Sequence, residues 1–465
     1  MGSIAEKIYY YSPHFLQNLW LNAYGLKVYL REYGKKFEKK LEEFEKRQWY
    51  SRGELEEYQN GRLRLLIKHS YENVPYYNKL FRENRLMPTD INTIHDLQKL
   101  PILTKDKVKS NMNFLIARNL RRSRLVLGLT SGTTGSPLEF YYDDHVCLIK
   151  NVVDWRHKRS AGVNVGDKIA IFWGRVVVPG TRTEPPFWRY NWMLNQLLFS
   201  SYHLSTNNLR LYIRQLEKVA PKALEGYPST LYVMACYLQN LGKTLPVEAV
   251  FTSSEALFPH QREIIEQAFE CKVFDFYGLA ERVAFATECT AHCGLHLNMD
   301  FGITEILNMD HEPVGHGEMG KIVATGLHNF AMPLIRYETN DVTVFQGQKC
   351  TCGREAPMIG DLTTRAEDII TTRDGRYISF ASLTLPIKLI GNVGESQIIQ
   401  EDLEHIRIRI VKRAGYRERD TQNLLEEFRK RIGADMKVEL EFVDSIPRSR
   451  TGKFRFVISK VPLKL

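Results

Sequence analysis

Short apolar runs alternate with helix-like segments through the middle of the chain, between about residues 125 and 342. Three of these runs are Lys168–Phe172, Val247–Thr252 and Val273–Phe276, each partly β-branched and too short for a helix. Strands that alternate with helices are joined by crossovers, which favours parallel strands covered by helices on both faces. The central region is therefore predicted to be α/β, with parallel or mixed sheets beneath helices.

Two regions of different pattern flank this central region. Residues 1–100 carry aromatic and charged residues at helical spacing with few glycines, which predicts a mainly helical segment. Past Arg365, apolar alternation in His405–Val411 and Lys437–Val443 brackets the helical stretch Thr421–Ile432, which is typical of a small α+β unit. A chain of 465 residues exceeds what one hydrophobic core usually supports, so we expect at least two domains.

A glycine- and hydroxyl-rich loop follows the apolar stretch at Leu125–Leu127. It contains Thr130, Ser131, Gly132, Thr133, Thr134 and Gly135. Glycines let a backbone fold closely around phosphate oxygens, and hydroxyls and free amides donate hydrogen bonds to them. The loop lacks the Gly-Lys-Ser/Thr ending of a Walker A motif, so it predicts a phosphate site of another kind. Alone it could also be an ordinary polar turn.

Four further segments follow this loop in order. They are Phe276–Glu281, Pro333–Asp341, Arg365–Ile369 and Ile446–Arg455. Together with the loop they resemble, in order and spacing, the adenylate-forming superfamily of acyl-CoA ligases, luciferases and nonribosomal-peptide adenylation domains. The details are most similar to the phenylacetate-CoA ligase branch and its capsular-polysaccharide-biosynthesis relatives. The resemblance implies activation of a carboxylic acid by ATP as its acyl-AMP.

This resemblance implies a nucleotide site. Tyr277 would stack on adenine, Glu281 would hold Mg²⁺, Asp341 would bind the ribose hydroxyls and Arg365 the nucleotide. The other implied nucleotide-binding residues, besides those of the glycine-rich loop, are Ser253, Ser254, Glu255, Phe276 and Gly278. A hard carboxylate oxygen suits Mg²⁺, and a carboxylate can accept hydrogen bonds from two hydroxyls. Three positions depart from the family pattern: Ala280, Asn340 and Thr364.

The resemblance also implies a mobile carboxy-terminal domain. A large domain would span 1–364 and a small one 365–465, with a hinge near 365–368 at Glu367. The terminal loop would place Lys453 at the reacting carboxylate and α-phosphate, where a cation stabilises developing charge. Without the other segments, that loop would be a solvated basic turn.

The acyl pocket is expected near Trp173, Tyr227 and Ser253, from their position relative to the other segments. Coenzyme A is the acceptor that the resemblance implies, with a carrier-protein thiol or an amino sugar as alternatives. Two other functions stay open: an amide or acyl ligase that modifies a sugar in polysaccharide biosynthesis, and a non-catalytic nucleotide-binding scaffold. The joint presence of four residues argues against the scaffold: Glu281, Asp341, Arg365 and Lys453.

Cysteine and histidine gather in two clusters. One holds Cys289, His292, Cys293 and His296, and the other holds Cys350 and Cys352. Thiolate and imidazole are the ligands that zinc prefers, and two close pairs usually complete one tetrahedron in structural sites. We predict a structural zinc on Cys289, His296, Cys350 and Cys352, with Cys293 or His292 as substitutes. Unmetallated thiols in loops are the alternative.

Charge and cysteine usage limit the setting of the protein. The net charge is +10 and the pI is about 9.1, but no zinc-finger spacing, aromatic RNP-like strand or helix-turn-helix signal accompanies them, so nucleic acid is not expected as a partner. Seven cysteines, an odd number, without a signal peptide favour a reducing, cytoplasmic setting.

An aromatic stripe near the amino terminus has two interpretations. It comprises Tyr9, Tyr10, Tyr11, Phe15, Leu19 and Trp20. We expect it to pack on the body of the protein. Peripheral association with the inner face of a membrane is the alternative.

Overall fold

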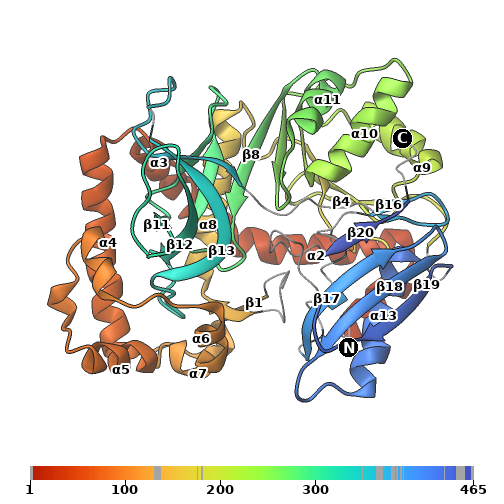
Figure 1. Ribbon diagram of the computed structural model, residues 1–465. Helices are drawn as coiled ribbons and strands as arrows, with labels where there is room; N and C mark the ends of the chain where they lie inside the picture. The colour runs from red at the N-terminus through yellow and green to blue at the C-terminus, as the bar shows by residue number, and fades with distance from the viewer. Residues whose placement is uncertain are drawn as a thin grey trace.

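The computed structural model describes the chain from residue 4 to residue 461 with gaps. The described residues are 4–129, 138–174, 176–179, 182–347, 349–362, 370–378, 383, 386–387, 390, 392–433, 435–446 and 456–461. Figure 1 shows the helices of residues 52–83 along the left flank, the helix of residues 14–32 across the middle, and the small carboxy-terminal sheet at the lower right beside the N-terminus. The predicted α/β class, with a small α+β unit near the carboxy terminus, is confirmed.

Helices form the amino-terminal region and recur between the strands. The α-helices are α1 (Ile4–Tyr11), α2 (His14–Glu32), α3 (Phe37–Arg47), α4 (Arg52–Asn73), α5 (Pro75–Glu83), α6 (Lys105–Ser110), α7 (Met112–Leu115), α8 (Asp144–Ser160), α9 (Thr206–Val219), α10 (Pro228–Asn240), α11 (Pro259–Phe269) and α13 (Glu418–Ile432). Short 3₁₀ turns are η1 (Pro88–Asp90), η2 (Ile94–Lys99) and η3 (Arg122–Arg124). Local sequence explains the starts: Ser51 and Glu54 form a capping box before α4, and Asp143 accepts the Val146 amide before α8.

Within the described residues, twelve strands form the main sheet, in the order β11-β12-β13-β14-β10-β9-β8-β7-β6-β3-β5-β4. Their bounds are β3 (Ile169–Phe172), β4 (Trp188–Asn191), β5 (Gln196–Phe199), β6 (Ala223–Gly226), β7 (Ala249–Ser253), β8 (Lys272–Gly278), β9 (Phe285–Glu288), β10 (Leu295–Leu297), β11 (Gly302–Leu307), β12 (Met319–Gly326), β13 (Tyr337–Gln346) and β14 (Met358–Leu362). Strands β8, β7, β6, β3 and β5 are parallel, whereas the flanking strands pair antiparallel.

The parallel strands lie deep in the protein because helices cover the sheet. Every residue of β3, β6 and β7 is buried. Such strands are fully apolar when helices pack on both faces, so a charged residue in one of them requires a partner. Glu225 in β6 is such a residue.

Smaller sheets complete the chain. Strands β1 (Val126–Leu129) and β2 (Glu139–Tyr142) pair antiparallel, as do β15 (Ile370–Thr371) and β16 (Tyr377–Ile378). A carboxy-terminal sheet has the order β19-β18-β17-β20 and joins α13 around its own hydrophobic core. Its strands are β17 (Val393–Gln400), β18 (His405–Lys412), β19 (Lys437–Phe442) and β20 (Val457–Ser459). The predicted strands His405–Val411 and Lys437–Val443 and the helix Thr421–Ile432 match β18, β19 and α13 closely.

The amino-terminal aromatic stripe divides between two environments. The hydroxyls of Tyr9 and Tyr10 donate to the carbonyls of Val177 and Val176, as the packing interpretation predicts. The other four members, Tyr11, Phe15, Leu19 and Trp20, are exposed, so the expected packing is wrong for them. Phe15, Leu19 and Trp20 lie on α2, which turns Gln17 and Asn22 inward to the β4 hairpin and leaves these three side chains outside. No helix in the described part of the chain is both long and apolar enough to cross a membrane.

Candidate functional site

Several predicted site residues lie side by side at the carboxyl ends of the parallel strands. Phe172, Gly226 and Thr252 are paired in register across β3, β6 and β7, and Ser253 is paired with Phe276 across β7 and β8. One position further along the strands, four residues therefore lie at the same level of the sheet edge: Trp173, Tyr227, Ser253 and Phe276. Ligands of open α/β sheets bind outside the carboxyl ends of strands, so this edge is the candidate site.

The predicted acyl side of this edge is aromatic. Trp173 and Tyr227 meet edge to face, with ring centroids 5.0 Å apart. Gly226 lies beneath them, where a Cβ atom would come within 2.8 Å of the Phe172 Cβ, so only glycine fits there. Trp173 Nε1 donates to Glu225 Oε1 at 3.2 Å, which fixes the indole.

A buried charge network beneath the aromatic pair was missed by the sequence analysis. Lys158 Nζ lies 2.7 Å from Glu225 Oε2 and 3.0 Å from Asp154 Oδ2. Burial acts to lower the pKa of Lys158, but the Asp154 and Glu225 carboxylates outweigh it and raise that pKa. The available signal was Glu225, an acid inside an otherwise apolar strand. The network joins α8 to β6 and, through Trp173, to the candidate site at the strand edge.

Two tyrosine–carboxylate pairs form the predicted nucleotide side. Tyr277 donates its hydroxyl to Asp341 Oδ2 at 2.8 Å, and Tyr337 donates to Glu281 Oε1 at 2.8 Å. Burial, followed by the neighbouring carboxylates, raises the pKa of Tyr277 and of Tyr337, so both hydroxyls stay protonated donors. Sequence patterns assign Tyr337 no role of its own within Pro333–Asp341, whereas in the structure its hydroxyl orients Glu281, the predicted magnesium ligand.

The remaining residues at this edge are held by local contacts. Ser254 has a left-handed backbone at φ +70°, a conformation that costs energy for a residue with a side chain and clusters at functional sites. Glu255 Oε2 accepts the amide of Ser229 at 3.1 Å, so it caps the start of α10. Phe276 stacks on Phe285, with centroids 5.3 Å apart.

Asp275, one residue before Phe276, is a second acid that the sequence analysis did not single out. It accepts a hydrogen bond from Thr252 Oγ1 at 2.7 Å. Burial, with a smaller contribution from the nearby Glu288 charge, raises the pKa of Asp275 to about 7. A half-buried acid with a raised pKa is typical of functional sites and of structural networks alike.

Several predicted residues lie outside the described residues. They are Thr130, Ser131, Gly132, Thr133, Thr134 and Gly135 of the glycine-rich loop, Arg365 and Glu367 near the predicted hinge, and Lys453. Their roles stay predictions. Strands β1 and β2 lie on either side of the loop. They pair antiparallel, from Val126 opposite Tyr142 to Leu129 opposite Glu139.

The four predicted zinc ligands converge at one point. The ligand atoms of Cys289, His296, Cys350 and Cys352 all lie within 4.8 Å of one another, although they come from two distant segments. The two sulfurs of Cys289 and Cys350 are 3.5 Å apart, and Cys352 Sγ is 3.4 Å from His296 Nε2. Three thiols and one imidazole form a donor set that fits tetrahedral zinc.

Outer contacts orient this cluster. His296 Nδ1 lies 3.1 Å from the Ala356 carbonyl, which favours a proton on Nδ1 and leaves the Nε2 lone pair facing the sulfurs. Burial lowers the pKa of His296 to about 4, so the ring is neutral, as a ligand must be. The two alternates do not join the set. Cys293 is exposed and donates to the Ala291 carbonyl, and His292 Nδ1 lies 3.4 Å from Glu288.

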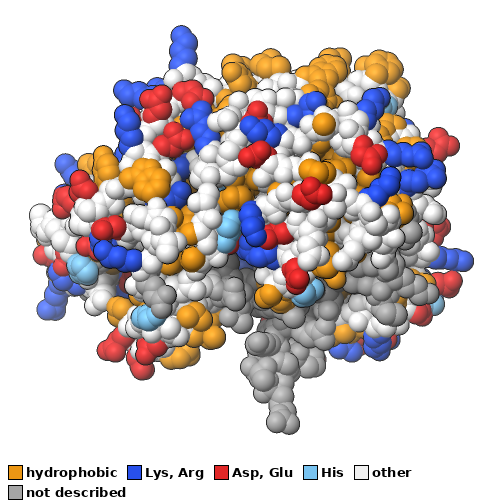
Figure 2. All heavy atoms as spheres, turned by 90° about the horizontal axis from the view of Figure 1, so that it is seen from above, with side chains coloured by type: hydrophobic (Ala, Val, Ile, Leu, Met, Phe, Trp, Pro, Cys, Tyr) orange, Lys and Arg blue, Asp and Glu red, His pale blue; other side chains and the backbone are white. Residues whose placement is uncertain are grey.

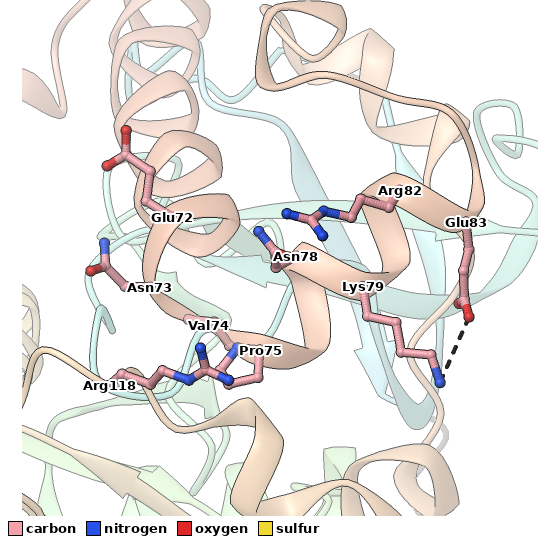
Figure 3. A pocket seen from close by; sticks show the side chains of 9 residues that line it. All are labelled: Glu72, Asn73, Val74, Pro75, Asn78, Lys79, Arg82, Glu83 and Arg118. Carbon is pink, nitrogen blue, oxygen red and sulfur yellow. Dashed lines mark ion pairs between the residues drawn. The ribbon is translucent and has the colours of Figure 1, made fainter.

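Two hollows lie away from the strand edge. A cavity of about 530 Å³ borders the cluster at Cys289, Cys352 and Arg354. The other hollow, of about 410 Å³, lies where α4 meets α5, and Figure 3 shows its wall of charged and amide side chains, with Lys79 paired to Glu83 at 3.6 Å. On the face in Figure 2, acidic and basic side chains intermingle, so that face offers no single-sign surface to a polyanion.

Comparison with known proteins identifies relatives along almost the whole chain. The family model for the CapK C-terminal domain matches residues 370–460. Protein CapK of Staphylococcus aureus is 28% identical over 98% of this chain and 99% of its own length. The phenylacetate-coenzyme A ligase of Pseudomonas putida is 25% identical over 87% of this chain and 94% of its own.

The fold is shared with a solved ligase. The structure of 2-hydroxyisobutyryl-CoA ligase in complex with 2-HIB-AMP and CoA superposes with a TM-score of 0.59 at 22% identity. The match covers 88% of this chain and 91% of that one. The superposition shows a shared fold. The chain is therefore similar to CapK and to phenylacetate-coenzyme A ligases over most of its length, and it shares its fold with an acyl-CoA ligase.

Proposed function

We propose that this protein is an ATP-dependent, adenylate-forming ligase that converts a carboxylic acid into its acyl-AMP and then transfers the acyl group to coenzyme A. One observation carries the proposal. The two carboxylates expected to hold Mg²⁺ and ribose, Glu281 and Asp341, are each oriented by a buried tyrosine near the edge that carries Trp173 and Tyr227. Relatives described as phenylacetate-coenzyme A ligases support the reaction class.

The proposed chemistry needs positioning and charge neutralisation rather than a nucleophilic side chain. The substrate carboxylate oxygen attacks the α-phosphorus of ATP, the bond to the bridging oxygen breaks, and pyrophosphate leaves. Bound Mg²⁺ would neutralise phosphate charge. Glu281 would hold the metal, Asp341 the ribose and Tyr277 the adenine. In the second step a coenzyme A thiol, after loss of its proton, attacks the acyl carbonyl and AMP leaves.

We also propose that residues 365–465 move as a domain relative to residues 1–364, about Glu367. In the present arrangement Arg376 joins the two parts, because it is buried and donates to the carbonyls of Tyr202 and Ile432. Tyr202 belongs to the large part of the chain but packs in the core of the small sheet. A rotation would have to break this contact or carry it along.

Pyrophosphate release tests the proposal directly. We expect Mg-ATP to be cleaved to pyrophosphate in the presence of one acid from a panel of aryl, fatty, short-chain and amino acids. Adding coenzyme A should then yield an acyl thioester and AMP. The acid that supports release identifies the substrate. No release with any acid, in protein shown to be folded, would contradict adenylation of these acid classes.

We propose that Cys289, His296, Cys350 and Cys352 hold one structural zinc. We expect about one zinc per chain by elemental analysis, and removal by a chelator should lower the thermal unfolding temperature, because a closed tetrahedral site contributes folding energy. The substitution Cys352→Ser should lower the zinc content.

Cys293→Ser is the matched control for the zinc site. Cys293 lies in the same loop but is exposed and outside the four-residue set, so its loss should leave the zinc content unchanged. Zinc below about a tenth of an equivalent in protein purified without chelator would contradict the site. Equal loss of zinc in both variants would contradict the ligand assignment.

A further inference from the structure

The helix α2 turns its polar side chains toward the protein. Gln17 accepts from Arg189 Nε at 2.8 Å. Asn22 donates to the Tyr190 carbonyl at 3.0 Å and accepts from the Trp192 amide at 2.7 Å. These bonds fix the helix to the β4–β5 hairpin through its polar face. A surface helix normally does the reverse and buries its apolar stripe.

The outer face of α2 is consequently apolar. Phe15, Leu19, Ala23, Leu26 and Leu30 recur at helical spacing and form one stripe, and all are exposed. The exposed fractions are 90% for Tyr11, 69% for Phe15, 60% for Leu19, 50% for Trp20, 54% for Tyr24 and 67% for Leu30. Trp192, which is 61% exposed, lies beside the helix at the turn of the hairpin. An apolar patch of this kind marks an interaction surface.

Basic residues accompany the stripe. Between Ile8 and Lys40 the chain has six basic residues and two acidic ones. Lys27 is exposed on α2 itself, and Lys35, Lys36 and Lys39 are exposed directly after it. The only ion pair recorded on α2 in the described part of the chain joins Arg31 to the adjacent Glu32. The surface therefore combines aromatic and aliphatic side chains with positive charge.

The dimensions of the stripe argue against a second copy of the chain as its partner. A helix of 19 residues is about 28 Å long and about 10 Å wide, so its projected footprint is roughly 300 Å². A stable protein interface buries about 800 Å² on each partner. A lipid interface has no such threshold, because a helix can lie in its plane with the apolar face immersed.

We propose that the outer face of α2, with Tyr11 at the end of α1, docks on an anionic lipid bilayer. Tyr and Trp favour the level of the headgroups, leucine and phenylalanine the acyl boundary, and lysines the negative surface. The polar contacts of Gln17 and Asn22 would hold the helix in the plane of the membrane while the body stays in water. The enzyme would then act at a membrane surface without spanning it.

Cosedimentation with vesicles tests this proposal on the full chain. We expect binding to vesicles of phosphatidylcholine with about a third phosphatidylglycerol, and weaker binding to phosphatidylcholine alone. Binding should fall as NaCl rises to about 0.5 M, because salt screens the charge contribution. The double substitution Phe15→Ser/Leu19→Ser should weaken binding at least about tenfold, because each buried apolar side chain contributes about that factor or more.

The matched control removes two hydrophobic residues of similar exposure elsewhere. Leu65 on α4 and Phe114 on α7 are 55% and 58% exposed, and Leu65→Ser/Phe114→Ser should bind vesicles as the parent does. Equal loss in both double variants would overturn the assignment to α2, and no binding of the parent to anionic vesicles at low salt would overturn the proposal. A dimer dissolved by Leu19→Ser would assign the face to a second copy instead. Pyrophosphate release without vesicles reports on adenylation separately.

Discussion

Replacing Lys158 with methionine is expected to lower the free energy of unfolding by about 3–5 kcal/mol, because it leaves two carboxylates buried without their cation. Lys158 is buried and lies within 3.0 Å of both Asp154 and Glu225. Methionine keeps most of the side-chain volume, so the loss reports the missing charge rather than a cavity. Thermal unfolding followed by circular dichroism at neutral pH measures the change.

The control for Lys158→Met is a substitution in a surface ion pair with a similar distance between nitrogen and oxygen. Lys222 lies 2.9 Å from Asp167, but both side chains are partly exposed, so Lys222→Met should cost no more than about 1 kcal/mol. In the triple variant Lys158→Met/Asp154→Asn/Glu225→Gln no buried charge is left, and part of the stability should return. A loss in Lys158→Met no larger than in the surface variant would contradict the role of the network.

The same network makes stability depend on pH with a definite sign. Burial would raise the pKa of Asp154, but Lys150 and Lys158 outweigh it and hold that pKa below its usual 3.8. A lowered acid pKa contributes stability above its unfolded value and loses it as pH falls through the folded value. Lys158 behaves in the opposite way, since its pKa is raised above 10.5 and its contribution is lost only at higher pH. Between about pH 4 and 10 the full contribution of the network is present.

Features with a strong local pattern could be predicted from the sequence. The short apolar runs predicted strands β3, β7 and β8, and the predicted ends of each strand lie within one or two residues of the observed ends. Such strands are recognisable because a parallel strand covered by helices is mostly apolar. The cysteine and histidine spacing likewise predicted which four side chains converge, while the zinc itself stays a prediction. Zinc tolerates few ligand types, so Cys289, His296, Cys350 and Cys352 stood out in two short segments.

Features that depend on contacts between distant segments could not be predicted. The partner of Glu225 is Lys158, 67 positions earlier, and nothing in the local sequence of α8 distinguishes that lysine from a solvated one. Tyr337 orients Glu281 across 56 positions. The aromatic stripe was expected to pack on the body, with a membrane surface as the alternative, because helical spacing shows that a stripe exists but not which side meets the protein. Here the polar side carried the specific contacts, through Gln17 and Asn22.

Replacing Glu281 with glutamine is expected to lower the rate of pyrophosphate release by about 100-fold or more, if Glu281 is the magnesium ligand proposed above. Glutamine keeps an acceptor for the Tyr337 hydroxyl, so the pair can persist while the negative charge is lost. The loss should be accompanied by a higher Mg²⁺ concentration for half-maximal rate. Titrating Mg²⁺ at saturating ATP with parent and variant measures both effects.

Two substitutions on strand β13 separate metal binding from a general loss of structure. Glu338→Gln removes a carboxylate beside Tyr337 that pairs with Lys321 at 2.9 Å, and it should leave both rate and Mg²⁺ requirement unchanged. Tyr337→Phe keeps the Glu281 charge but removes one hydrogen bond, so a smaller loss of about tenfold is expected. If Glu281→Gln kept the parental Mg²⁺ requirement and rate, the carboxylate would be a structural partner of Tyr337 only. The metal would then have to be held by ATP and by residues other than Glu281, because an essential carboxylate ligand cannot lose its charge without weakening the binding of a hard cation.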